Sequence, residues 1–181
     1  MVGLGRRGVL AVEAPDPVLS LASALGLALA AGTALVVDIE GGVSVGRSFG
    51  DLVADGPSSG DLGPGRSGVA LISGSGVDDG GRDALVEDLA RSWPAVVLRC
   101  GPGHWPWPTV PVRPLISGLL APPPGLTAVW QPLDRMVSPP GNGPVLPPLR
   151  RGITRALVSG RAIRSNRWVR AWAGVWELPW A

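Results

Sequence analysis

The stretch SLASALGLALAAGTALVVDIEGG (Ser20–Gly42) decides the fold class, because it predicts a buried helix followed closely by a buried strand. Its leucines recur every four residues, the spacing of one helix face, at Leu21, Leu25 and Leu29. Gly32 comes next, at a position where glycine commonly ends a helix. The following segment, Thr33–Glu40, is apolar up to its two acids, which is typical of a strand covered on both faces.

The residues before this stretch predict where the helix begins. Asp16 suits the N-cap and Pro17 suits the first helical position. A transmembrane helix over residues 17–37 is an alternative interpretation, since 21 uncharged residues lie between Asp16 and Asp38 and that length can span a bilayer. The serines and glycines within the run, and the break at Ala30–Thr33, favour a helix and a separate strand.

Helical and strand patterns alternate along the rest of the chain. Strands are expected at 7–15, 68–76, 94–103 and 125–133, and helices near 49–54, at 83–92 and from 149 onward. The proline-rich segment HWPWPTVPVRP (His104–Pro114) is expected to form neither a regular helix nor a central strand. This alternation predicts an α/β fold with a mainly parallel sheet flanked by helices.

The composition excludes several classes of site. All sixteen basic residues are arginine, so a lysine general base, a Schiff-base lysine and a phosphate-loop lysine are excluded. The single His104 cannot build a multi-histidine metal site, and the single Cys100 excludes an intrachain disulfide. A Cys100–His104 couple lacks a visible third group to orient it. The net charge of +2 gives no argument for nucleic-acid binding.

The order of these elements resembles the ParA/MinD family of P-loop ATPases, including the CpaE/TadZ branch of pilus-assembly and polar-localisation proteins. GVLAVEA (Gly8–Ala14) is similar to the strand before the phosphate loop, and Ser20–Gly42 to the following helix, glycine and strand. SGVALISGSG (Ser67–Gly76) is similar to a later short strand. WPAVVLRCGPG (Trp93–Gly103) and TAVWQPLD (Thr127–Asp134) are similar to the Walker-B strand and to a strand ending in Gln-Pro. The resemblance spans roughly residues 7–160.

The chain departs from this family at the nucleotide site. The phosphate loop would be EAPDPVLS (Glu13–Ser20), which has no glycine, no lysine and two prolines that remove N–H donors. Arg99 stands at the Walker-B position, where it cannot hold Mg²⁺. The resemblance therefore implies a pseudo-ATPase without nucleotide or other cofactor. Its vestigial site would consist of Asp16, Ser20, Asp38, Glu40 and Arg99, with Arg99 pairing with Asp38 or Asp16 in place of the lost cation.

The C-terminal segment RSNRWVRAWAGVWELPWA (164–181) is rich in tryptophan and arginine. A helical projection predicts an amphipathic helix from about Arg164 to Leu178, with Pro179 ending it. We treat 1–160 as a degenerate ParA/MinD-like domain and 161–181 as this C-terminal helix. The helix could pack on its own sheet, lie on an anionic membrane surface or dock on a protein partner. Its candidate contact residues are Arg164, Arg167, Trp168, Arg170, Trp172, Trp176 and Trp180.

Two further tryptophans, Trp105 and Trp107, lie in a proline-rich loop and are candidates for a lid over the sheet or a binding lip. The leading functional expectation is a non-catalytic localisation or assembly factor for a pilus, secretion or cell-division machine. It would be cytoplasmic, with peripheral attachment at the inner membrane face left open, and it would bind a protein partner or itself but no nucleic acid. The alternatives are an integral membrane protein anchored by 17–37 and an enzyme with a rebuilt pocket near Asp38, Arg99 and His104.

Overall fold

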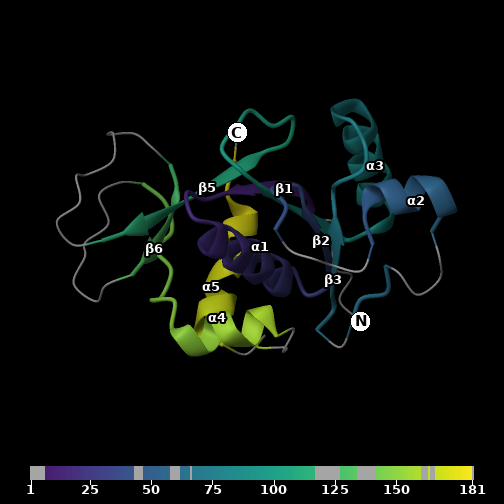
Figure 1. The fold of residues 1–181 in the computed structure, drawn as a ribbon. Helices are drawn as coiled ribbons and strands as arrows, with labels where there is room; N and C mark the ends of the chain where they lie inside the picture. Colours follow the sequence, from purple (N-terminus) through teal and green to yellow (C-terminus); the bar gives the residue numbers. More distant parts are fainter. Residues whose placement is uncertain are drawn as a thin grey trace.

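The computed structural model describes residues 7–42, 47–57, 62–65, 67–116, 127–133, 142–159, 163 and 166–180. Strands and helices alternate through most of this chain (Figure 1). The strands are β1 (Gly8–Glu13), β2 (Ala34–Asp38), β3 (Val69–Ser73), β4 (Ala95–Cys100), β5 (Thr109–Leu115) and β6 (Val129–Pro132). The helices are α1 (Pro17–Ala31), α2 (Phe49–Asp55), α3 (Asp79–Ser92), α4 (Arg151–Val158), α5 (Arg167–Ala171) and the 3-10 helix η1 (Trp172–Glu177).

The six strands form one sheet in the order β3-β2-β4-β1-β5-β6, and every neighbouring pair is parallel. The expected α/β fold with a parallel sheet and flanking helices is thus confirmed. In a parallel sheet all carboxyl ends meet at one edge. The register sets Asp38 of β2 directly beside Arg99 of β4 at that edge.

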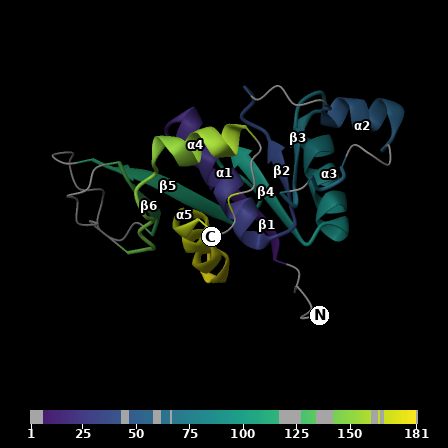
Figure 2. The same ribbon diagram turned by 90° about the horizontal axis from the view of Figure 1, so that it is seen from below.

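The two faces of the sheet are covered by different helices (Figure 2). Val36 and Val97 face one core cluster, built by α1, α4, α5 and η1. Leu35 and Leu98 point the opposite way, into a cluster completed by Phe49 of α2 together with Val86 and Leu89 of α3. This alternation follows from the strand period of two and explains why the strands are apolar at successive positions.

Helix α1 begins and ends where the sequence predicts. The Asp16 carboxylate accepts hydrogen bonds from the N–H groups of Val18 and Leu19 at 3.0 and 2.9 Å. Gly32 ends the helix with a φ of 91°, a conformation that favours glycine. Residues 17–37 therefore form α1 and β2 instead of the single helix that a membrane span would need. In the described ranges, no helix has the length and apolarity required to cross a membrane.

Helix α3 begins four residues earlier than the expected Asp83. Asp78 is its N-cap and accepts a hydrogen bond from the N–H of Gly81 at 2.8 Å. The two glycines at 80 and 81 suggested a turn, but they occupy the first helical turn. A good cap therefore outweighs the low helix propensity of glycine at this position.

The expectation that the proline-rich segment forms no central strand is wrong, because β5 lies between β1 and β6 and includes Pro111 and Pro114. The pairing explains how a strand with two prolines can lie there. β5 pairs with β1 over residues 109–111 and with β6 over residues 112–115. Each half thus behaves as an edge strand on one side, where a missing N–H is tolerated.

The C-terminal segment forms two short helices in place of the predicted amphipathic helix. α5 ends at Ala171 and η1 continues to Glu177, while Arg164 lies outside the described residues. Both helices contact α1. Gly26 of α1 makes this approach possible, because a Cβ atom there would lie 2.6 Å from ring atoms of both Trp168 and Trp172. The segment is therefore part of the same hydrophobic core cluster as α1 and the face of the sheet that α1 covers.

Candidate functional site

A buried ion pair lies at the carboxyl ends of β2 and β4. Nη1 of Arg99 donates a 2.8 Å hydrogen bond to Oδ1 of Asp38, and the two residues are 2% and 1% exposed. The same nitrogen donates to the backbone carbonyl of Gly41 at 2.8 Å. Of the two expected partners of Arg99, Asp38 is the one found. Pairing makes the burial of both charges tolerable in this environment.

The network extends from this pair to helix α1. Nη2 of Arg99 lies 3.1 Å from Oε2 of Glu40 and donates to the carbonyl of Pro17 at 3.2 Å. The buried Ser20 hydroxyl donates to the same Glu40 oxygen at 2.9 Å. One arginine thus links β2, β4 and the first turn of α1. Four of the five residues of the predicted vestigial site meet here.

The fifth residue, Asp16, closes the turn between β1 and α1. Its carboxylate occupies the N–H groups of Val18 and Leu19, which are among the donors a helix N-terminus would offer to a phosphate. The connection from Glu13 to Pro17 is three residues long, so it forms a cap and not a loop around an anion. Asp16 stabilises the start of α1 as an N-cap, and its exposed carboxylate presents a negative charge that would repel a phosphate.

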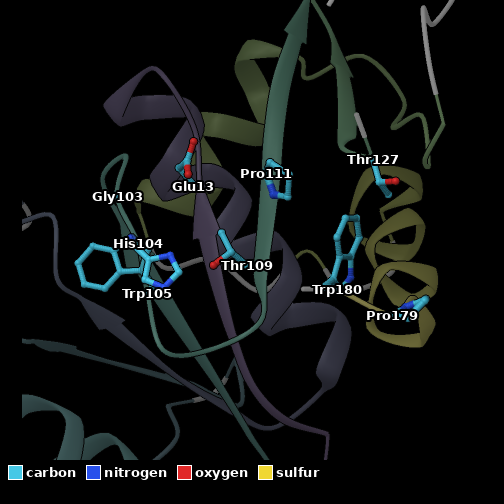
Figure 3. A pocket seen from close by; sticks show the side chains of 9 residues that line it. All are labelled: Glu13, Gly103, His104, Trp105, Thr109, Pro111, Thr127, Pro179 and Trp180. Atoms are coloured by element: carbon cyan, nitrogen blue, oxygen red, sulfur yellow. The ribbon is translucent and has the colours of Figure 1, made fainter. Parts of the chain in front are cut away.

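A hollow of about 440 Å³ lies beside the end of β1 and the first half of β5 (Figure 3). Glu13 and His104 line it, and Trp105 and Trp180 form aromatic walls. On the neighbouring strand, Nη2 of Arg113 donates to Oε1 of Glu13 at 2.8 Å. Local sequence patterns contain no signal for this pair, because Glu13 and Arg113 are 100 positions apart and their strands meet only in the fold.

His104 does not share this hollow with Asp38 or Arg99. Both of those residues are buried and paired with each other, so the expected rebuilt pocket around Asp38, Arg99 and His104 is not what the structure has. Within the described ranges, no group of three or more histidine, cysteine, aspartate or glutamate side chains could hold a metal ion.

The two loop tryptophans pack on the cluster under α2 and α3. The indole N–H of Trp105 donates to the carbonyl of Gly101 at 3.1 Å, and the Arg82 guanidinium lies 5.6 Å from a ring centroid of Trp105. Trp107 is half-buried against the same cluster. Trp105 therefore covers core atoms and also lines the hollow beside Glu13.

The tryptophans of the C-terminal segment divide into two groups. Trp168 and Trp172 are 1% and 0% exposed, so the expectation that they contact a membrane or partner does not fit their place in the core. Both side chains pack in the hydrophobic core of α1 and the sheet. The indole N–H of Trp168 donates to Oε1 of Gln131 at 2.7 Å. Trp176 and Trp180 are half-buried and donate to the carbonyls of Leu27 and Val175.

The side chain of Cys100 is fully buried between β4 and the α2–α3 layer. Burial, partly offset by the positive charge of Arg82, raises the pKa of the thiol from 9.0 to about 12. Near neutral pH the thiol stays protonated, which makes Cys100 a poor nucleophile. A Cys100–His104 couple is not favoured by this environment.

The raised pKa of Cys100 predicts a loss of stability at alkaline pH. Between pH 9 and about 12 the thiol is ionised in the unfolded chain and protonated in the folded one. The folded state then binds more protons, so the free energy of unfolding falls with rising pH, by up to about 1.4 kcal/mol per unit. The absence of lysine and tyrosine leaves few other groups to titrate in this range.

Urea unfolding at a series of alkaline pH values measures this effect, with Cys100→Ala as the matched variant. We expect the variant to show a much flatter dependence on pH than the parent chain. Equal slopes for both proteins would mean that Cys100 does not ionise on unfolding in this range.

Comparison of the chain with models of known protein families, with curated proteins and with solved structures gives no match.

Proposed function

We propose that the chain is a nucleotide-free relative of the ParA/MinD ATPases, acting as a non-catalytic localisation or assembly factor. The Arg99 network carries this proposal. It fills the carboxyl edge of the sheet between β2, β4 and α1, the part of an open α/β sheet where ligands commonly bind. A site that is already filled by a protein cation and two carboxylates has no room for the charge of a nucleotide and its Mg²⁺.

The turn before α1 supports the same conclusion independently. Asp16 takes up helix N–H groups that a phosphate would need, and the chain has no lysine to reach a phosphate. A domain of this kind acts through contacts with other molecules. The pathway we favour is the assembly of a pilus, a secretion machine or the division septum, on the cytoplasmic side of the membrane.

Burial limits which side chains are available for these contacts. Trp168 and Trp172 are buried, so they are not available to insert into a membrane in this fold. The arginines of α5, Arg167 and Arg170, remain exposed. The proposal therefore places the contacts on charged surfaces and not on a tryptophan stripe.

Calorimetric titration of the full chain with ATP·Mg²⁺ tests the proposal. We expect no heat of binding and no rise in the thermal unfolding temperature. A ligand at a hundred times its dissociation constant would raise the free energy of unfolding by about 2.7 kcal/mol, so binding would be visible in both measurements. Micromolar binding that is lost in a variant of the predicted site, such as Ser20→Ala, would overturn the proposal.

A further inference from the structure

Five exposed arginines of the C-terminal third lie at the start of α4, on α4 and on α5, in the layer that also holds α1, and we call them the basic face. They are Arg150, Arg151, Arg155, Arg167 and Arg170. None of them makes a hydrogen bond or ion pair through its side chain with the part of the chain that the structure describes. In contrast, each of the other described arginines has a carboxylate partner, namely Arg7, Arg47, Arg82, Arg91, Arg99 and Arg113.

The opposite charge collects on α2, α3 and the residues that cap them. This acidic face holds Asp51, Asp55, Asp78, Asp79, Asp83, Glu87 and Asp88 against Arg47, Arg82 and Arg91. Those three arginines pair with Asp55, Asp79 and Asp88. Asp83 and Glu87 have no ion pair or side-chain hydrogen bond within the described residues. The acidic face therefore keeps unneutralised charge at its surface.

The two faces lie on opposite sides of the sheet. α4 and α5 belong to the layer with α1, and α2 and α3 belong to the other layer. Both ribbon views show α4 well apart from α2 and α3 (Figures 1 and 2). One copy of the chain cannot bring its own faces together, but the basic face of one copy can meet the acidic face of another.

The spacing of the unpaired charges also matches. Arg151 and Arg155 are four residues apart on α4, and Asp83 and Glu87 are four residues apart on α3. Residues at this spacing lie on the same side of a helix, with Cβ atoms about 5–6 Å apart. The α4 surface beside Arg151 and Arg155 is open, with only a shallow depression that Thr154 and Ser159 also line. A helix with two carboxylates at the same spacing can therefore lie against it with both charges opposed.

We propose that the chain associates head to tail with further copies of itself, through the basic face of one copy and the acidic face of the next. Such a contact uses two different surfaces, so each added copy leaves one face free and growth continues beyond a dimer. Insertion into a membrane fits the basic face less well. The exposed large apolar side chains of the described residues are Val18, Val53, Ile116, Leu133, Val145 and Leu178, and none lies on α4 or α5.

Sedimentation velocity of the full chain tests this proposal. We expect the average mass to rise with protein concentration at about 0.1 M salt and to return to that of one chain at about 1 M salt, because the screening length falls from about 10 Å to about 3 Å. Arg151→Glu/Arg155→Glu and Asp83→Arg/Glu87→Arg should each weaken self-association at least about tenfold, since each sets like charges against each other. Arg151→Lys/Arg155→Lys keeps the charge and should associate as the parent chain does.

Mixing the two charge-reversed variants gives the decisive result. Each variant alone should associate far more weakly than the parent chain, but each carries the complement of the other, so an equimolar mixture should form heteromeric complexes. Circular dichroism of each variant checks that the exposed substitutions leave the fold intact. A parent chain that stays monomeric at low salt, association that survives both reversals, or a mixture that fails to associate would overturn the proposal.

This inference does not depend on the proposed loss of nucleotide binding. Monomeric behaviour would leave the calorimetric result untouched, and ATP binding would leave the charge-reversal result untouched. Vesicles of phosphatidylserine and phosphatidylcholine, added in the same experiment, give a further outcome. If the basic face binds them while the chain remains monomeric, the basic face has an anionic lipid surface as its partner, and self-association is excluded.

Discussion

Arg99→Ala should lower the free energy of unfolding by about 3–5 kcal/mol, because it leaves the carboxylate of Asp38 buried without a counter-charge. The substitution also removes the donor to the carbonyls of Gly41 and Pro17, so the first turn of α1 loses a link to β4. Urea unfolding at neutral pH measures the loss. We expect this to be among the most destabilising single changes in the chain.

The ion pair of Arg113 and Glu13 supplies a matched control. Its N–O distance of 2.8 Å equals that of Arg99 and Asp38, but its side chains are 30% and 16% exposed instead of 3% and 0%. Arg113→Ala should therefore cost less than about 1 kcal/mol. The double variant Arg99→Met/Asp38→Leu has no buried charge at position 38 and should therefore be more stable than Arg99→Ala. If Arg99→Ala leaves stability unchanged, the network does not hold the edge of the sheet together.

Trp168→Ala should cost about 3–5 kcal/mol, the usual range for removing a large aromatic side chain from a core. Trp168 is 1% exposed, packs edge to face on Trp172 and donates a hydrogen bond to the fully buried Gln131. The alanine variant creates a cavity against Gly26 and leaves Oε1 of Gln131 without this partner. Thermal and urea unfolding measure the change, which should also weaken the attachment of α5 to α1.

Trp180→Ala tests whether position in the core, and not tryptophan itself, causes the loss. Trp180 is half-buried, and its indole N–H bonds the carbonyl of Val175 within the same segment. We expect a loss of about 1 kcal/mol or less at this half-buried site. Trp168→Phe keeps most of the packing but removes the hydrogen bond to Oε1 of Gln131, at a cost of about 1–3 kcal/mol. Equal losses for the alanine variants of Trp168 and Trp180 would contradict a core position for α5.

The burial of this segment also affects how membrane binding can be tested. Trp168, Val169, Trp172 and Val175 belong to the main core cluster. A chain that ends at Gly160 lacks all four, so its behaviour toward vesicles would reflect damage to the core. Substitution of exposed arginines in the full chain is the sounder comparison, because those side chains have no packing role in the described structure.

Local signals were enough to predict α1 and its surroundings. Asp16 and Pro17 start the helix, Gly32 ends it, and each effect acts within a few residues of the chain. The approach of Arg99 to Asp38 was also predictable once β2 and β4 were expected as parallel strands, since Asp38 is the last residue of β2 and Arg99 is the residue before the last in β4. In these cases the physical cause lies within one element or follows from a general rule of parallel sheets.

The position of β5 and the packing of the C-terminal segment could not be predicted from such local signals. Two prolines are incompatible with a strand that is hydrogen-bonded on both sides along its whole length. However, β5 changes its pairing partner from β1 to β6 between residues 111 and 112. The regular spacing of Trp168, Trp172 and Trp176 fits a surface helix and a core helix equally well. Periodicity shows that one face of a helix is apolar, but it does not show what covers that face.

The amino-acid sequence by itself determined the alternation of helices and parallel strands, the ends of α1 and the absence of a phosphate-loop lysine, because these depend on residue type and near neighbours. The tertiary structure alone decided that Trp168 and Trp172 fill a space beside Gly26, that Glu13 meets Arg113, and that the basic and acidic helices lie on opposite sides of the sheet. Those outcomes depend on how segments far apart in the chain pack against each other, and this packing is defined only when the whole core is formed.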